Sequence, residues 1–295
     1  MHRSTPNQAI RLPRGVRTTL PAPSPVTVHV YRPEPTDRPP AGRLVWAHGG
    51  SWQYGSALEW HHVTSTLAAR SGWEVISVDY RLAPRHRHPD ALQDIMTALT
   101  WAEKGRAGLP LAVGGDSAGG TLAACAALAA RDRGLALDAQ VLAYPPFDPD
   151  CGSPSFQSDP DAFPQAASLQ RAWRAWRGSS GLAAHDENGT RLYSTPFEAA
   201  SLVGVAPAVL AVGTADPVRD DVLAYAGRLR GDRVPVRLLR LPGVGHGDVL
   251  QPGSPLLGRL AQELAALGGP PPAGRRPPAS PTSAFPASNP WKESP

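Results

Sequence analysis

The alternation of apolar and polar positions along the chain predicts strands that take turns with helices. Short apolar runs of strand length are each followed by segments whose apolar residues repeat at helical spacing. The predicted strands are residues 26–31, 43–47, 74–78, 111–114, 140–144, 208–212 and 236–241. The predicted helices are residues 62–69, 90–104, 118–131, 220–229 and 254–267. Because such alternation forms parallel βαβ units, we expect an α/β fold: a mostly parallel central sheet with helices on both faces.

Three stretches interrupt this rhythm. Residues 1–25 are rich in Pro, Arg and Thr, which predicts an N-terminal arm or reduced cap before a single domain over residues 26–268. Residues 147–200 carry many Pro, Ser and Asp and predict a lid-type insertion, within which Leu169, Trp173 and Trp176 fall at helical spacing. Residues 269–295 are rich in Pro, Ser and Ala and predict a disordered tail.

Composition narrows the class of protein. The 295 residues suit one large domain, and the basic residues behind the net charge of +4 are scattered, so no nucleic-acid module is expected. Cys125 and Cys151 form neither a disulfide framework nor a metal-ligand spacing, and no cofactor is implied. We find no apolar run long enough to span a bilayer and no signal-like N-terminus, and therefore expect a cytoplasmic protein.

The most informative motif is Gly-Asp-Ser-Ala-Gly-Gly at residues 115–120. A predicted strand precedes it and a predicted helix follows, which is the setting of a nucleophile elbow. In such a turn Ser117 projects its hydroxyl group above the sheet, and Gly115 and Gly119 leave room for the neighbouring backbone. Ser117 is therefore the candidate nucleophile.

A serine hydroxyl needs a base, and the base needs an acid to orient it. In a fold with this elbow the chain order is Ser, acid, His. Among the histidines after Ser117, His246 follows a strand directly, whereas His185 lies in the irregular insertion. Asp216 follows the strand 208–212 and is favoured as the acid over the pair Asp220 and Asp221, because carboxylates at a helix start more often serve the helix dipole.

The developing oxyanion of an ester reaction needs hydrogen-bond donors. His48-Gly49-Gly50-Ser51 follows the strand 43–47, and this loop supplies such donors in folds with a nucleophile elbow. We expect the backbone N–H groups of Gly49, Gly50 and Ala118 to form the oxyanion hole. His48 is expected to anchor the loop.

With these residues in place, the chain resembles the hormone-sensitive-lipase-like (bacterial family IV) esterases of the α/β-hydrolase superfamily. The resemblance rests on five segments: HGGSW (48–52), VDYRLAP (78–84), GDSAGG (115–120), TADPVRDD (214–221) and GHGD (245–248). It implies an α/β-hydrolase fold that hydrolyses short- to medium-chain carboxylic esters, with a Ser117–His246–Asp216 triad, an acyl-enzyme intermediate and neither metal nor cofactor. Some relatives pair through their last edge strand, here residues 236–241, so a homodimer is an expectation.

The chain departs from the family pattern at three positions. Ser51 stands in place of a third glycine, Arg85 in place of a glutamate, and Asp248 in place of an aromatic residue. Since the triad and the oxyanion donors are kept, these departures bear on the substrate pocket more than on the chemistry. Trp52, Trp173 and Trp176 are candidate pocket residues, and the alternative is that the Trp rings of the insertion only attach it to the body.

Two other functions remain open at this stage. HGGSW also resembles the HGGxW motif of kynurenine formamidases, so an amidase or formamidase of the same fold is an alternative. A non-catalytic binding protein with a hydrolase fold is less favoured, because such proteins usually lose a triad residue. The natural ester, its acyl chain length and stereochemistry, and transfer of the acyl group to another alcohol are not determined by the sequence.

Overall fold

The computed structural model describes residues 16–19, 26–34, 39–178 and 184–268. Within them a sheet of eight strands has the order β1-β2-β4-β3-β5-β6-β9-β10. Its strands are β1 (Val16–Thr19), β2 (Val28–Pro33), β3 (Arg43–Ala47), β4 (Glu74–Val78), β5 (Leu111–Asp116), β6 (Ala139–Ala143), β9 (Ala208–Gly213) and β10 (Val236–Leu241). The β1–β2 and β2–β4 pairs are antiparallel, and every other pair in this sheet is parallel.

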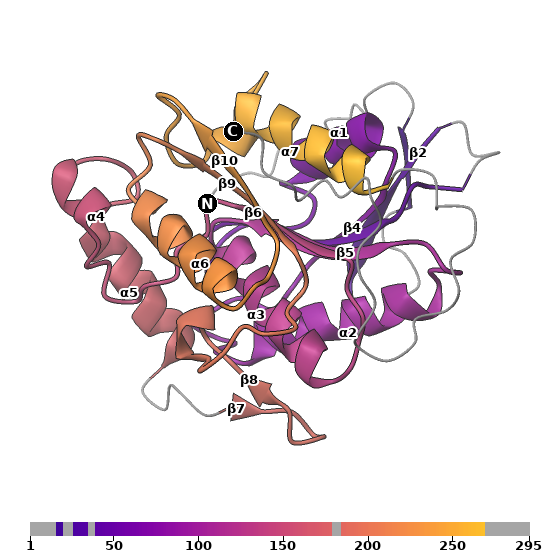
Figure 1. Cartoon of the computed structure of the whole chain (residues 1–295), viewed down its shortest axis with the longest axis horizontal. Helices are drawn as coiled ribbons and strands as arrows, with labels where there is room; N and C mark the ends of the chain where they lie inside the picture. Colours follow the sequence, from indigo (N-terminus) through magenta and orange to yellow (C-terminus); the bar gives the residue numbers. More distant parts are fainter. Residues whose placement is uncertain (1–15, 20–25, 35–38, 179–183, 269–295) are drawn as a thin grey trace, which may run out of the picture.

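Helices cover both faces of the sheet (Figure 1). One face carries α1 (His61–Ser71) and α7 (Pro255–Leu267), which pack against each other. The other face carries α2 (Asp90–Lys104), α3 (Ala118–Asp132) and α6 (Arg219–Gly231). The predicted α/β-hydrolase fold, with its mostly parallel sheet between two helical layers, is therefore confirmed.

The inner strands are continuously apolar because both of their faces are covered. Every residue of β3, β4, β5, β6 and β9 is buried. These strands and the helices α1, α2, α3, α6 and α7 begin and end within two residues of the predicted bounds. The predicted strand 26–31 corresponds to β2, which begins at Val28. The prediction that it is the first strand is wrong, because β1 precedes it and pairs with it at the edge of the sheet.

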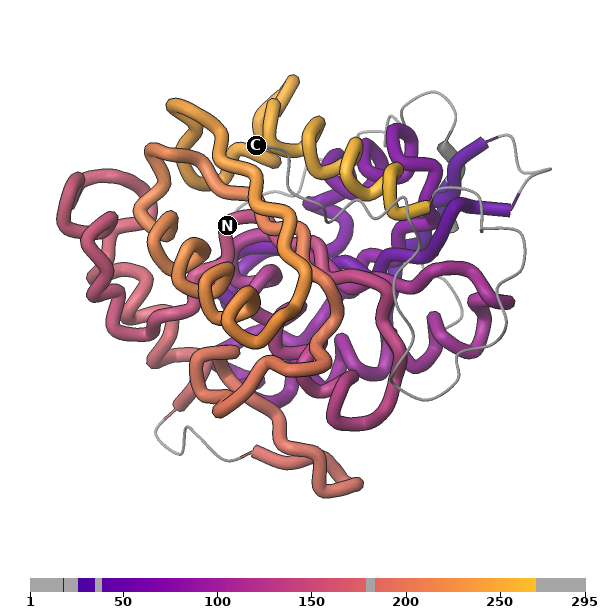
Figure 2. Tube along the Cα trace, in the orientation of Figure 1, coloured from indigo at the N-terminus to yellow at the C-terminus, as the bar shows by residue number. Residues whose placement is uncertain are grey.

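The chain between β6 and β9 leaves the sheet and runs along one side of the body (Figure 2). It forms α4 (Pro154–Ser158), α5 (Ala166–Arg177), the hairpin β7 (Ala184–His185) and β8 (Arg191–Leu192), and the 3-10 turn η1 (Pro196–Glu198). The helix predicted from the spacing of Leu169, Trp173 and Trp176 is α5, and all three side chains are buried. Whether this segment acts as a lid stays a prediction.

Two further expectations concern the edges of the molecule. Strand β10 ends the sheet, so the surface expected to pair in a homodimer lies at an edge, and the dimer itself stays a prediction. The predicted disordered tail at residues 269–295 lies outside the described residues. Among the helices that are described, none has both the length and the apolar character needed to cross a membrane.

Candidate active site

Ser117 occupies the sharp turn between β5 and α3. Its backbone has φ 49° and ψ −124°, a conformation that side chains disfavour, and its N–H donates to the carbonyl oxygen of Ala143 at 2.9 Å. A Cβ atom on Gly115 would lie 2.4 Å from Gly119, and one on Gly119 would lie 2.1 Å from the Ala47 carbonyl oxygen. Only glycine fits at these two positions, which explains the motif that identified the turn.

Ser117, His246 and Asp216 form a continuous chain of hydrogen bonds. The distance from Ser117 Oγ to His246 Nε2 is 2.9 Å. His246 Nδ1 lies 3.0 Å from Oδ1 and 2.9 Å from Oδ2 of Asp216, so the carboxylate is placed to accept an N–H bond from the imidazole. The side chains of His246 and Asp216 are 4% and 0% exposed, so water competes little for this bond.

These residues meet because parallel strands bring their carboxyl ends to one edge of the sheet. Ser117 follows β5, Asp216 follows β9 and His246 follows β10. Asp216 is fixed there because its Oδ1 also accepts the N–H of Val218, at 3.0 Å.

The carboxylates and the histidine that were weighed against these residues have other contacts. Asp220 accepts the N–H of Ser155 at 2.8 Å, and Asp221 accepts the N–H groups of Phe147 and Asp148 at 2.8 and 3.0 Å. Both carboxylates thereby attach α6 to the segment after β6. His185 is exposed in β7.

The loop of residues 48–51, the expected oxyanion loop, packs directly against the turn of Ser117. A Cβ atom on Gly49 would lie 2.5 Å from Asp116 Oδ2, and one on Gly50, whose φ is 107°, would lie 2.1 Å from the Tyr54 carbonyl oxygen. Ala118 is the first residue of α3, so its N–H has no partner within the helix. The three proposed oxyanion donors thus belong to two segments in contact.

His48 and Tyr80 fix this loop by hydrogen bonds and ring stacking. His48 Nδ1 donates to the Gly49 carbonyl oxygen at 2.7 Å, and the Tyr80 hydroxyl group donates to the His48 carbonyl oxygen at 2.8 Å. Their rings stack with centroids 4.3 Å apart. Burial lowers the pKa of His48, although the bond to the Gly49 carbonyl oxygen opposes that shift.

Asp116 is a buried carboxyl group between the elbow and the oxyanion loop. Burial raises its pKa to about 7, although the Trp60 indole N–H, which donates to Oδ2 at 3.0 Å, opposes that shift. Within the part of the chain that the structure describes, its carboxyl group forms no hydrogen bond with Ser117 or His246. Its position fits a residue that holds the two segments together.

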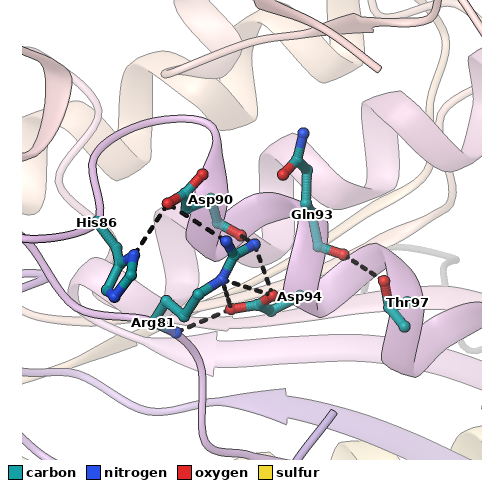
Figure 3. Close-up of polar contacts among 6 residues, drawn as sticks. All are labelled: Arg81, His86, Asp90, Gln93, Asp94 and Thr97. Atoms are coloured by element: carbon teal, nitrogen blue, oxygen red, sulfur yellow. Dashed lines mark hydrogen bonds and ion pairs between the residues drawn. The ribbon is translucent and has the colours of Figure 1, made fainter. Parts of the chain in front are cut away.

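The segment after β4 is anchored to α2 by a charged cluster (Figure 3). Arg81 Nε lies 3.0 and 2.9 Å from the two carboxylate oxygens of Asp94, and the Arg81 N–H donates to Oδ2 at 2.9 Å. Asp90 lies between Arg81 and His86, at 3.3 and 3.2 Å. Two residues of this segment, Tyr80 and Arg81, thus link the oxyanion loop to a helix of the body.

The departures from the family pattern have local structural consequences. Asp248 Oδ2 accepts the N–H of Leu256 at 3.1 Å and the Ser254 hydroxyl group, so it connects the His246 loop to the start of α7. Ser51 adopts φ 55°, a region that glycine enters at lower cost. Arg85 is exposed.

The three candidate pocket residues form one stacked cluster. The rings of Trp52 and Trp176 are parallel within 2°, with centroids 4.6 Å apart, and Trp173 lies 4.4 Å from Trp52. All three side chains are at most 1% exposed. In this arrangement they attach α5 to the oxyanion loop, and their role as pocket walls stays a prediction.

Two residues beside His246 were not predicted from the sequence. The Tyr144 ring lies 4.7 Å from the imidazole, and the Phe163 ring lies 5.7 Å from it. Tyr144 directly follows β6, so the rule that found Asp216 at a strand end offered a signal for it. Phe163 lies in the irregular stretch between α4 and α5, where the pattern carries no signal.

No group of three or more His, Cys, Asp or Glu side chains in the described ranges is arranged to hold a metal ion. The hydrogen bonds described above offer the chemistry of a hydroxyl group beside a buried His–Asp pair. Such a pair can accept the proton of Ser117 and return it to another oxygen or nitrogen atom.

The known proteins that this chain resembles are esterases of the α/β-hydrolase fold. A family profile described as the alpha/beta hydrolase fold matches residues 44–250. The chain is 36% identical over 230 residues to carboxylesterase NlhH of Mycobacterium tuberculosis, and the aligned region covers 76% of this chain and 71% of NlhH. It is 34% identical over 236 residues to ethyl acetate hydrolase of Pseudomonas putida, and the aligned region covers 77% of this chain and 72% of that hydrolase. The crystal structure of esterase LipW from Mycobacterium marinum superposes with a TM-score of 0.74 at 32% identity, over 86% of this chain and 82% of LipW.

The matched range, residues 44–250, includes all five segments on which the family resemblance rested. The chain belongs to the hormone-sensitive-lipase-like (family IV) branch of the α/β-hydrolase family.

Proposed function

We propose that this protein is a serine carboxylesterase that hydrolyses short- to medium-chain carboxylic esters. The observation that carries the proposal is the hydrogen-bond chain from Ser117 Oγ through His246 to Asp216, with distances of 2.9 Å at both ends. The names of the relatives, carboxylesterase NlhH and ethyl acetate hydrolase, support ester bonds as the target and a small ester as one substrate.

The proposed reaction has two halves. Ser117 Oγ attacks the ester carbonyl carbon while His246 Nε2 takes the hydroxyl proton, and the N–H groups of Gly49, Gly50 and Ala118 stabilise the oxyanion. When the carbon–oxygen bond to the alcohol breaks, His246 returns the proton to the leaving oxygen and an acyl-serine remains. Water, deprotonated by His246, then attacks this acyl group and releases the acid and Ser117. Asp216 holds the imidazole in the tautomer with a proton on Nδ1.

The test is hydrolysis of p-nitrophenyl acetate, butyrate, octanoate and palmitate by the wild type, Ser117→Ala and Ser201→Ala. Ser201 is an exposed serine just before β9, at the opposite end of the sheet from the candidate site. We expect turnover of the short esters by the wild type and Ser201→Ala, and loss of turnover in Ser117→Ala. A wild type inert on all four esters contradicts the proposal.

The formamidase alternative has one observation in its favour, the HGGSW segment at residues 48–52. Turnover of N-formylkynurenine against p-nitrophenyl acetate separates the two functions. Higher kcat/KM on the formamide would make this protein an amidase that uses the same three residues.

A further inference from the structure

Phe163 is an exposed aromatic residue in contact with the proposed catalytic base. Its side chain is 71% exposed, and its ring meets the His246 ring edge-on, at 64° with centroids 5.7 Å apart. Exposure of one apolar residue says little by itself, since much of any protein surface is apolar. The contact with His246 is what makes this residue informative.

The His246 imidazole has a buried aromatic neighbour and an exposed one. Tyr144 is fully buried, its hydroxyl oxygen accepts the N–H of Val249 at 3.3 Å, and its ring lies 4.7 Å from His246. Phe163 is followed by the buried Pro164 and the start of α5, so its backbone is held while its ring remains open to solvent. A molecule bound beside His246 therefore finds Phe163, and not Tyr144, as an accessible ring.

Ester chemistry decides which part of a substrate lies there. The acyl carbon must reach Ser117 Oγ, and the carbonyl oxygen must face the N–H groups of Gly49, Gly50 and Ala118. The proton held on His246 Nε2 is given to the leaving oxygen, so the alcohol part of the ester must lie next to the imidazole. A ring that contacts His246 from the solvent side accordingly meets the leaving group and not the acyl chain.

We propose that Phe163 forms the leaving-group subsite and that it favours esters of flat aromatic alcohols, that is, aryl esters. An aromatic leaving group can pack on the open ring in offset or edge-on geometry, which gains more than the same contact with a small alkyl group. This inference rests on the proposed esterase function. It adds a residue from the insertion to a site otherwise built from strand ends.

The experiment varies the alcohol at constant acyl group and then the acyl group at constant alcohol. Phenyl acetate, ethyl acetate and phenyl butyrate are hydrolysed by the wild type, Phe163→Ala and Phe163→Leu, and each variant is compared with the wild type so that intrinsic leaving-group reactivity cancels. Val203→Ala is the matched control, because Val203 is 60% exposed but lies before β9, at the far end of the sheet. Because Phe163 is exposed, its replacement leaves the core unchanged.

We expect Phe163→Ala to lower kcat/KM for both phenyl esters about 3- to 10-fold, mainly through KM, with ethyl acetate changed less than about 2-fold. Phe163→Leu, which keeps apolar bulk without a ring, should fall between Phe163→Ala and the wild type. Inhibition by phenol, which needs no turnover, should weaken by a similar factor in Phe163→Ala.

Three results would overturn the subsite. Equal losses on phenyl and ethyl acetate with a displaced pH profile would mean that the ring only shields His246 from water. A change in the butyrate-to-acetate ratio would put Phe163 beside the acyl chain, and unchanged kinetics would leave it no role. A wild type inert on all three esters is distinguishable from these, because it refutes the esterase function itself and the subsite with it.

Discussion

The backbone of Ser117, the proposed nucleophile, is strained. Its φ of 49° with ψ of −124° is a strained conformation for any residue with a Cβ atom, at a cost of about 1–3 kcal/mol. Ser117→Ala and Ser117→Gly both remove the hydroxyl group, but only glycine relieves the strain. We expect both variants to lose esterase activity. The free energy of unfolding of Ser117→Gly should exceed that of Ser117→Ala by about 1 kcal/mol, because the relieved strain is partly offset by the larger entropy of the unfolded glycine chain.

Urea unfolding of the wild type, Ser117→Ala and Ser117→Gly measures this difference. Gly243→Ala is the control in the opposite direction, because it adds a Cβ atom to a residue whose φ is positive, at 70°. The added Cβ atom would meet nothing within 4 Å, so backbone strain alone should lower the free energy of unfolding of this variant. If Ser117→Gly were no more stable than Ser117→Ala, the elbow would hold no usable strain.

The acid gives a second prediction at the residue scale. Asp216→Asn keeps the size of the side chain but disturbs the tautomer of His246, so kcat should fall about 10³- to 10⁴-fold. Asp220→Asn is the matched control, because Asp220 bonds to Ser155 and not to His246, and it should keep kcat within a few-fold. Comparable losses in the two variants would contradict the assignment of Asp216, and p-nitrophenyl acetate turnover decides between them.

How far single residues could be predicted depended on whether a backbone rule applied to them. Asp216 was favoured over Asp220 and Asp221 because strand ends meet at one edge of a parallel sheet, and its hydrogen bonds to His246 agree with that choice. No such rule applies to Phe163. Its contact with His246 depends on the path of an irregular segment, which is set by tertiary contacts.

Among the elements, the inner strands and long helices could be predicted because burial on both faces makes their pattern strong. The short elements could not. β7 and β8 have two residues each and are held by distant contacts, such as the ion pair of Arg133 with Asp186 beside them. β1 was missed because VRTT, at an edge of the sheet, lacks an apolar run.

Helix α5 carries the prediction at the element scale. Trp176 stacks on Trp52 of the oxyanion loop, so Trp176→Ala should lower the free energy of unfolding by about 3–5 kcal/mol and also loosen that loop. We expect kcat on p-nitrophenyl acetate to fall and proteolytic cleavage within residues 159–178 to become faster. The measurements are urea unfolding, steady-state kinetics and limited proteolysis.

Trp73→Ala is the matched control for this change. Trp73 is equally buried but precedes β4, at the end of the sheet opposite the candidate site. It should cost a similar free energy of unfolding while cleavage within residues 159–178 stays slow. Equal proteolysis of both variants would mean that the Trp cluster does not specifically attach α5.

At the scale of the whole molecule, the sheet explains why a site dispersed over 198 positions, from Gly49 to His246, could be read from a sequence. Each segment of the site follows a strand, and the parallel order β3-β5-β6-β9-β10 brings those strand ends together. The layout of the site therefore follows from topology. Its electrostatics depend on packing, and Asp116 shows this, because only the fold reveals that its carboxyl group is buried.

That burial predicts how the stability of the whole protein depends on pH. The pKa of Asp116 is raised from an unfolded value near 4 to about 7, chiefly by burial, so between these values the folded state binds more protons than the unfolded state. Asp116 therefore makes the free energy of unfolding decrease as pH rises from about 4 to about 7, by an amount on the order of a few kcal/mol. Asp116→Asn cannot ionise and should lack this decrease. The measurement is urea unfolding from about pH 4.5 to 8, with Asp150→Asn, at an exposed position, as control. The free energy of unfolding of Asp116→Asn should rise relative to that of the wild type up to about pH 7, and the difference should then stay constant. A constant difference over the whole range would mean that Asp116 stays ionised in the folded protein.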